Sequence, residues 1–210
     1  MTSVTARRPE TPTRQLLRLG RGLLRHGTGS DNISRVTYLP SLPGEAGVIE
    51  VFRAYSEKAG PMLQYHQTLM RGPSQLSVGQ RELIAAFVSG LNSCGFCHDV
   101  HSAIAGMFGV DEETLTTLVT DVDTAAIDEP TKALLRYVRK LTLTPSRVTP
   151  GDAQAVLDAG WSEEALHDTA AVCALFNFMN RFVDGLGVAT GPDYKQGIAK
   201  HLAENGYIDA

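Results

Sequence analysis

Apolar residues recur every three to four positions along most of the chain after residue 40, and this helical rhythm is the strongest constraint on the fold. The segment "GEAGVIEVFRAYSEKAG" shows the rhythm at Val48, Val51, Phe52 and Tyr55, and "LSVGQRELIAAFVSGL" repeats it. No stretch alternates apolar and polar residues as a strand does, and no glycine-rich phosphate loop is present. The sequence therefore predicts an all-α protein.

Capping residues predict where the helices begin and end. Ser77 and Gln80 have the spacing of a capping box, and Gly90 marks the expected end of that helix. The last long helix is expected to run through "EEALHDTAAVCALFNFMNRFVDGLG". Further helix starts are expected at Asp111, near Pro130, at Thr149–Pro150 and at Ser162. The connections are short, which predicts one compact domain over residues 36–210.

Composition places the chain among ordinary globular proteins. Its 210 residues are 43% hydrophobic and 20% charged, and no apolar run approaches the ~18 residues needed to cross a bilayer. Residues 1–35 lack the continuous apolar core of a secretory signal. Three cysteines are too few for a secreted disulfide framework. We expect a cytoplasmic protein without stable membrane insertion.

Charge is distributed unevenly along the chain. Residues 1–35 hold seven arginines against one glutamate and one aspartate, a net charge of +5; the whole chain carries −4, so residues 36–210 carry −9. The segment "RQLLRLGRGLLRHG" is interpreted as a basic arm that is flexible or packs on a neighbouring subunit. The acidic body argues against nucleic acid as a partner.

A close pair of cysteines lies in "GLNSCGFCHDVHSAI". If one helix ends near Gly90 and the next begins near Ser93, Cys94 and Cys97 fall in the first turn of the second helix. The unpaired N–H groups and the positive dipole end of that turn stabilise a thiolate. His101 follows Cys97 by one helical turn, so the two side chains share a face.

The short loop predicts that the two helices form an antiparallel hairpin. Glu82 precedes Gly90 by eight residues and His101 follows Ser93 by eight, so both lie roughly 12 Å from the turn. We therefore expect the carboxylate of Glu82 to meet the imidazole of His101 beside a thiol, an arrangement suited to acid–base chemistry.

These residues read E-x11-C-x-x-C-x-x-x-H, and the pattern resembles the AhpD-like alkylhydroperoxidases of the carboxymuconolactone decarboxylase superfamily. The likeness is strongest to the peroxidase-related branch, because "LFNFMNRFVDGLGV" resembles a segment typical of it. The resemblance spans roughly residues 40–190 and implies an all-helical homo-oligomer. Phe96 stands where some members carry a histidine between the cysteines, and here His98 follows instead.

The resemblance implies a peroxidase with no cofactor and no metal. In it Cys97 attacks the hydroperoxide substrate, Cys94 resolves the sulfenic acid to a disulfide, and His101 with Glu82 relays protons. It also implies a protein reductant, either lipoyl-bearing or thioredoxin-like. We expect Cys94, which is nearer the helix end, to be the more open of the two cysteines to solvent.

Two other functions stay open from the sequence alone. A thiol–disulfide oxidoreductase without peroxidase activity needs the same C-x-x-C. A zinc site could draw on Cys94, Cys97 and His101, with His98 or Glu82 as the fourth ligand, although no second cysteine pair follows downstream.

Other polar or reactive residues have a structural interpretation. Cys173 in "AAVCALF" is expected to be a buried core residue, and His66 and His167 are expected to pack or to face solvent. Asn177, Asn180 and Arg181 stand in an otherwise apolar helix and need polar partners, either at the site or at a subunit contact.

Overall fold

A computed structural model describes residues 37–188 and 191–208. In these ranges the chain forms nine α-helices and one short 3₁₀ helix and has no strand, which confirms the all-α prediction. The helices are α2 (Val48–Ala54), α3 (Ser56–Arg71), α4 (Val78–Leu91), α5 (Gly95–Met107), α6 (Glu112–Thr120), α7 (Glu129–Leu143), η1 (Pro145–Arg147), α8 (Pro150–Asp158), α9 (Glu163–Gly185) and α10 (Pro192–Asn205). No helix in the described ranges is long and apolar enough to cross a membrane.

Three helices begin at the capping residues that the sequence predicts. Ser77 Oγ accepts a hydrogen bond from the backbone N–H of Gln80 at 3.1 Å, and the Ser77 N–H donates to Gln80 Oε1 at 2.9 Å. Asp111 caps α6 and Ser162 caps α9 in the same way, each through its side-chain oxygen. Such caps satisfy N–H groups that the helix itself leaves unpaired. These helix starts are therefore confirmed.

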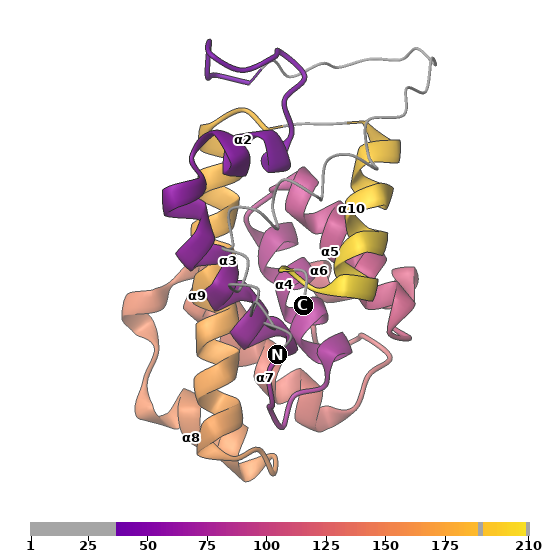
Figure 1. Ribbon diagram of the computed structural model, residues 1–210. Coiled ribbons are helices and arrows are strands. Elements are labelled where there is room, and N and C mark those ends of the chain that lie inside the picture. Colours follow the sequence, from indigo (N-terminus) through magenta and orange to yellow (C-terminus); the bar gives the residue numbers. More distant parts are fainter. Residues whose placement is uncertain (1–36, 189–190, 209–210) are drawn as a thin grey trace, which may run out of the picture.

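The hairpin of α4 and α5 forms the centre of the fold (Figure 1). Helix α4 is buried on nearly all sides, with Ile84 and Phe87 each 1% exposed. Helices α7 and α9 pack against α4, and α8 packs against α7 and α9. Burying one such large apolar side chain contributes about 1.5–3 kcal/mol, so the packing of α7 and α9 on α4 adds to the stability of the hairpin.

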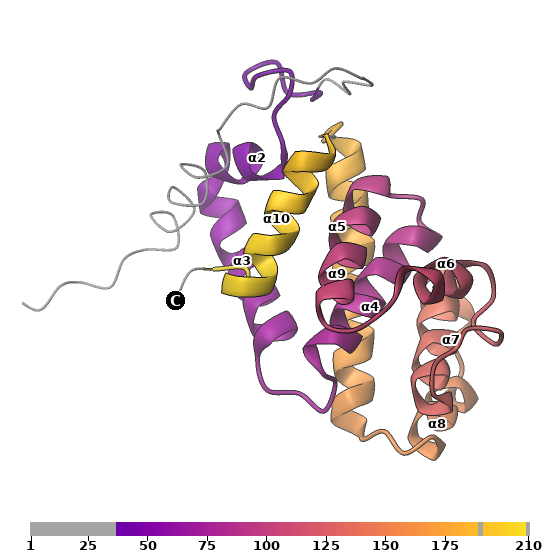
Figure 2. The same cartoon turned by 90° about the vertical axis from the view of Figure 1, so that its right-hand side faces the viewer.

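Helix α10 lies against α5, and its C-terminal end reaches α3 (Figure 2). The expectation that the helix over 163–185 is the last long one is therefore wrong. The sequence "PDYKQGIAKHLAEN" contains few apolar residues, and only Ile198 and Ala199 are buried, so its helical rhythm is weak. This helix nevertheless covers one side of the candidate site.

The first predicted helix is divided in two. Tyr55 separates α2 from α3 with φ −120° and ψ 40°, values outside the helical region, and it is 43% exposed. Its assignment to the apolar face was therefore wrong. The predicted basic arm over 1–35 lies outside the described residues, and its boundary with the 36–210 domain stays a prediction.

Candidate active site

The turn between α4 and α5 has a constrained backbone. Asn92 is the C-cap of α4, Cys94 is the N-cap of α5, and Ser93 between them has a φ of 57°. A non-glycine residue in this left-handed region costs about 1–3 kcal/mol and persists only when its surroundings fix it. Backbone hydrogen bonds of 3.0 Å join Ser93 to Gly90 and Cys94 to Ser89, and these help to fix the turn.

Helix α9 supplies the side chains that hold this turn. Asn92 Nδ2 donates to the amide oxygens of Asn177 at 3.1 Å and Asn180 at 2.9 Å. Asn180 Nδ2 donates in turn to Ser89 Oγ at 2.9 Å, and Arg181 donates to the backbone oxygen of Asn177. Asn177 and Asn180 therefore position the cysteine turn, which answers one question that the sequence left open.

Both cysteines of the motif are buried in the hairpin. The exposed fraction is 0% for Cys94 and 3% for Cys97. The expectation that Cys94 is the more open to solvent is therefore wrong, because α9 covers the helix end at which it lies. Cys97, one turn further along, lines a cavity inside the domain, whereas Cys94 does not.

The neighbouring thiols of Cys94 and Cys97 shift each other's pKa in opposite directions. The hydrogen bond from Cys97 lowers the pKa of Cys94, and the backbone N–H of Cys97 adds to that effect against the influence of burial. The same hydrogen bond, together with burial, raises the pKa of Cys97 well above its usual value. One negative charge shared by this pair is therefore held first on Cys94, while Cys97 keeps the proton.

Glu82 and His101 meet as the hairpin geometry predicts. His101 Nδ1 lies 2.7 Å from Glu82 Oε2, and Glu82 is fully buried. The side chains next to Glu82 on its helix face, Ala85 and Ala86, are fully buried and small, so α5 approaches closely. The predicted contact is confirmed, while the proposed role of the pair stays a prediction.

Two residues that the sequence analysis missed also bind Glu82. Arg71 Nη1 donates to Glu82 Oε1 at 2.6 Å, and the Tyr207 hydroxyl donates to the same oxygen at 3.3 Å. Burial alone would raise the pKa of Glu82, but hydrogen bonds and charge from His101 and Arg71 lower it below its usual value. Glu82 is therefore an ionised carboxylate with both oxygens occupied.

The C-terminal residues are fixed to α3 around this carboxylate. Arg71 Nη2 donates to the backbone oxygen of Leu202 at 2.9 Å, and the Arg71 guanidinium lies 5.1 Å from the centre of the Tyr207 ring. The backbone N–H of Tyr207 donates to Gln67 Oε1 at 2.7 Å. The contacts of Glu82 thus join α3, the hairpin and the C-terminal segment.

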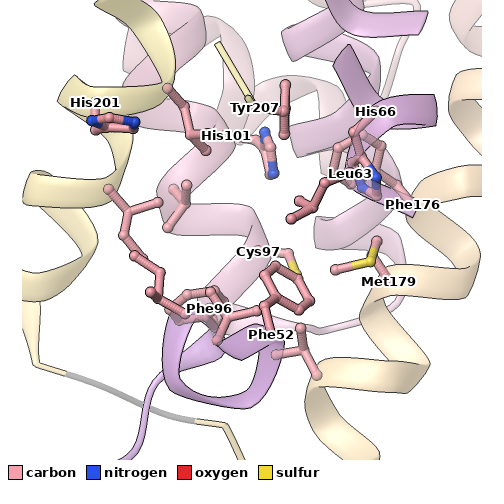
Figure 3. Close-up of a pocket in the computed structure, with 16 residues that line it drawn as sticks. Phe52, Leu63, His66, Phe96, Cys97, His101, Phe176, Met179, His201 and Tyr207 are labelled. Atoms are coloured by element: carbon pink, nitrogen blue, oxygen red, sulfur yellow. The ribbon is translucent and has the colours of Figure 1, made fainter. Parts of the chain in front are cut away.

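The cavity beside Cys97 is almost entirely apolar and has a volume of about 80 Å³. Figure 3 shows Cys97 and His101 among the lining side chains, with His201 on one side of the pocket and His66 with Phe176 on the other. His66 is 3% exposed, and the sequence had indicated only that it packs or faces solvent. The His66 side chain is packed inside the domain, where it forms part of the cavity wall.

The described ranges contain no cluster of ligands that would support the zinc alternative. No three His, Cys, Asp or Glu side chains there lie close enough together to hold a metal ion. His98 turns toward α4, where its Nδ1 lies 2.9 Å from the backbone oxygen of Ala86. Cys173 is fully buried beside Thr142 and Asn177, as expected for a core residue.

Solved structures with the same fold include proteins of different kinds. The AhpD-core, peroxidase-related protein of Ralstonia eutropha JMP134 is 24% identical, with a TM-score of 0.66 over 72% of this chain and 80% of that chain. The peroxidase-related protein of Silicibacter sp. TM1040 is also 24% identical, with a TM-score of 0.68 over 82% of this chain and all of that chain. The debrominase Bmp8 has a TM-score of 0.61 at 15% identity, over 75% of this chain and 82% of that chain. The fold alone therefore does not fix the reaction.

Sequence comparison locates the family more directly. The uncharacterized protein YdfG of Bacillus subtilis (strain 168) is 26% identical over 136 residues, which cover 64% of this chain and 92% of YdfG. The carboxymuconolactone decarboxylase family model matches residues 60–140, which include Glu82, Cys94, Cys97 and His101. Residues 60–140 of this chain are therefore similar to the carboxymuconolactone decarboxylase family, and the fold built around them is AhpD-like.

Proposed function

We propose that this protein is a thiol-dependent peroxidase that reduces organic hydroperoxides. The observation that carries the proposal is the common cavity: Cys97 and His101 line the same apolar space, and Glu82 is hydrogen-bonded behind His101. A nucleophile and a proton donor that face one bound molecule are what cleavage of an O–O bond needs. Cys94 lies next to Cys97, outside the cavity, where a resolving thiol belongs.

In the proposed reaction Cys97 passes its thiol proton to Cys94 and attacks the terminal oxygen of the hydroperoxide. An S–O bond forms as the O–O bond breaks, which gives a sulfenic acid on Cys97 and an alkoxide. His101 protonates the alkoxide to the alcohol, with Glu82 orienting its ring. A positioned acid of this kind contributes about 10²–10⁴ in rate. Cys94 then attacks the sulfenic sulfur, and water leaves as the disulfide forms.

Cys97 is assigned the role of nucleophile because it reaches the cavity. The pKa values alone would favour Cys94. The lower pKa belongs to Cys94, yet Cys94 does not reach the cavity. Of the two thiols of the motif, a hydroperoxide in the cavity meets only that of Cys97. The Cys94 thiolate is therefore assigned the part of local base for Cys97 in the first step and of resolving nucleophile in the second.

Reduction of the disulfide requires a thiol that can reach buried sulfurs. Cys94 and Cys97 are at most 3% exposed, so a flat protein surface does not contact them in this conformation. A lipoyl group is a slender dithiol on a flexible arm, so it needs a narrower approach to the sulfurs than a folded protein does. We therefore favour a lipoyl-bearing protein over a thioredoxin-like one as reductant, in a reducing compartment such as the cytoplasm.

The same burial weakens the alternative of a general thiol–disulfide oxidoreductase, whose protein substrates must also contact the sulfurs. The deciding experiment adds tert-butyl hydroperoxide to the pre-reduced, metal-free protein and counts free thiols and alcohol formed. Two thiols lost per alcohol, with the thiol of Cys173 retained, is the expected result. Unchanged thiols in the presence of excess hydroperoxide would contradict the proposal.

A further inference from the structure

His66 on α3 presents a second imidazole to the cavity, and its ring has a fixed tautomer. Its Nδ1 lies 2.9 Å from the backbone oxygen of Met62. A carbonyl oxygen can only accept, so Nδ1 carries the proton and Nε2 is left with a lone pair. Within the described part of the chain this ring makes no other hydrogen bond. Nε2 can therefore accept one from a molecule in the cavity that His66 lines.

His66 and His101 lie close together on the cavity wall. Both rings meet the ring of Phe176 edge-on, with centroid distances of 6.2 Å for His66 and 4.4 Å for His101. The ring of Tyr207, whose hydroxyl binds Glu82, lies 5.2 Å from His66. A small molecule beside His101 is therefore also beside His66.

The two imidazoles differ in the charge around them. Burial lowers the pKa of His66 to about 4, so the ring is neutral near neutral pH and its Nε2 can only accept. His101 differs in its partner: its Nδ1 donates to the ionised carboxylate of Glu82, and in the proposed reaction its Nε2 passes a proton to the alkoxide. The cavity thus holds one fixed acceptor next to one potential donor.

We propose that the cavity binds a short-chain alkyl hydroperoxide whose terminal O–H donates to Nε2 of His66. This inference rests on the proposed function and names its substrate class. The terminal oxygen then lies in reach of Cys97, and the inner oxygen, which becomes the alkoxide, faces His101. The alkyl group occupies the apolar space lined by Ile49, Phe52 and Val100.

Few other groups can satisfy that O–H. The polar side chains at the cavity wall, within the described residues, are Cys97, His66, His101, His201 and Tyr207. The oxygens of Glu82 are taken by Arg71, Tyr207 and His101, and His201 lies on the far side of the pocket from His66 (Figure 3). A buried hydroxyl without an acceptor is strongly disfavoured, so the lone pair of His66 decides whether the group can enter.

The size of the cavity limits the alkyl group. A cavity of about 150 Å³ holds benzene, and the space here is about 80 Å³, roughly half of that. A butyl group suits this volume better than a phenyl-substituted or long-chain group. We therefore expect tert-butyl hydroperoxide to be used more efficiently than cumene hydroperoxide.

The test compares His66→Phe, which keeps an aromatic ring but removes the acceptor, with His66→Gln, which restores an acceptor oxygen. His167→Phe is the matched control, because His167 is an exposed histidine outside the cavity. Folding of each variant is checked by circular dichroism. Two quantities are measured: the rate of Cys97 oxidation by tert-butyl hydroperoxide in a single turnover, and the dissociation constant of tert-butanol by NMR titration.

Tert-butanol keeps the O–H and the alkyl group but has no O–O bond, so its binding reports on the site without any turnover. His66→Phe is expected to weaken tert-butanol binding and to lower the single-turnover rate at low peroxide by about 5- to 100-fold. His66→Gln should recover part of both, and His167→Phe should stay within about twofold. Equal tert-butanol binding by wild type and His66→Phe would overturn this inference. Absence of peroxide reduction by wild type would instead overturn the proposed function.

Discussion

The site is made of two regions that the chain assembles in different ways. The α4–α5 hairpin carries the groups that we propose to react, and its key contact, between Glu82 and His101, joins residues 19 apart. The surround consists of α2, α3, α9, α10 and the C-terminal residues, and its contact from Tyr207 to Glu82 spans 125 residues. In the proposed function the hairpin supplies the reacting groups, while the surround influences the charge of Glu82 and the shape of the cavity. Substitutions in the hairpin should therefore lower turnover more than substitutions in the surround.

The largest effect is expected at the cysteines of the hairpin. Cys97→Ser removes the sulfur that faces the cavity and should abolish peroxide reduction. Cys94→Ser should reduce one equivalent of peroxide, more slowly than wild type because its local base is lost, and then stall. Dimedone labelling followed by mass spectrometry should locate the trapped sulfenic acid at Cys97.

Cys173→Ser is the matched control for this pair, because Cys173 is equally buried but lies in the core between Thr142 and Asn177. It should keep the peroxide burst. A dimedone label on Cys94 in the Cys97→Ser protein would reverse the assigned roles, and would mean that acidity rather than access to the cavity selects the nucleophile.

The second largest effect is expected at Glu82. Glu82→Gln keeps the size of the side chain but removes the charge that orients His101, so turnover should fall about 10- to 1000-fold. Initial rates under saturating reductant measure this, with thermal unfolding as a check on the fold. Glu164→Gln, at an exposed glutamate of α9, is the control. Equal turnover by the two variants would remove Glu82 from the mechanism.

The sequence predicted the hairpin well because its geometry is local. A capping box, a short loop and the rise per residue suffice to bring Glu82 opposite His101. The sequence misjudged the exposure of Cys94, since a helix end is open to solvent only if nothing packs on it. Here Asn177 and Asn180 of α9 cover the turn.

The surround could not be predicted in the same way. Arg71 and Tyr207 meet at Glu82 only after α3 and the C-terminal segment have packed on the hairpin. His66 looks like any single histidine on a helix until the cavity next to it exists. Helix α10 has too few apolar residues for its rhythm to stand out. The charge of Glu82 and the shape of the cavity thus arise from tertiary packing, and no local sequence pattern predicts them.

A third prediction tests the charge that the surround supplies. In the wild type, the lowered pKa of Glu82 means that its ionised form stabilises the fold above the ordinary glutamate pKa, and this contribution is lost as the pH falls through the folded-state pKa. Arg71→Met removes the guanidinium that pairs with Glu82 Oε1, and the effect of burial then moves the pKa of Glu82 upward. Turnover and the free energy of unfolding should both begin to fall at a higher pH than in the wild type.

Rates and urea unfolding between about pH 4 and pH 8 measure this shift, and the loss of turnover should be about 3- to 30-fold on the acid side and smaller above pH 7. Arg71→Lys, which keeps the charge, should restore most of the wild-type profile. Arg136→Met removes an exposed cation paired with Asp123 and should leave the profile unchanged. A uniform loss at every pH in Arg71→Met would indicate a packing defect rather than a charge effect.

The smallest effect is expected at Tyr207. Burial raises the pKa of Tyr207 well above its usual value, so the hydroxyl stays neutral and donates to Glu82. The bond is long, at 3.3 Å, and Arg71 serves the same oxygen at 2.6 Å, so losing it changes the charge of Glu82 little. Tyr207→Phe keeps the ring beneath Arg71 and should lower turnover only about two- to fivefold.

Tyr194→Phe is the matched control, because Tyr194 is a tyrosine that binds Glu50 instead of Glu82. If Tyr207→Phe lost as much turnover as Glu82→Gln, the division between a reacting hairpin and a tuning surround would not hold, because Tyr207 would then be as essential to the relay as the carboxylate it contacts.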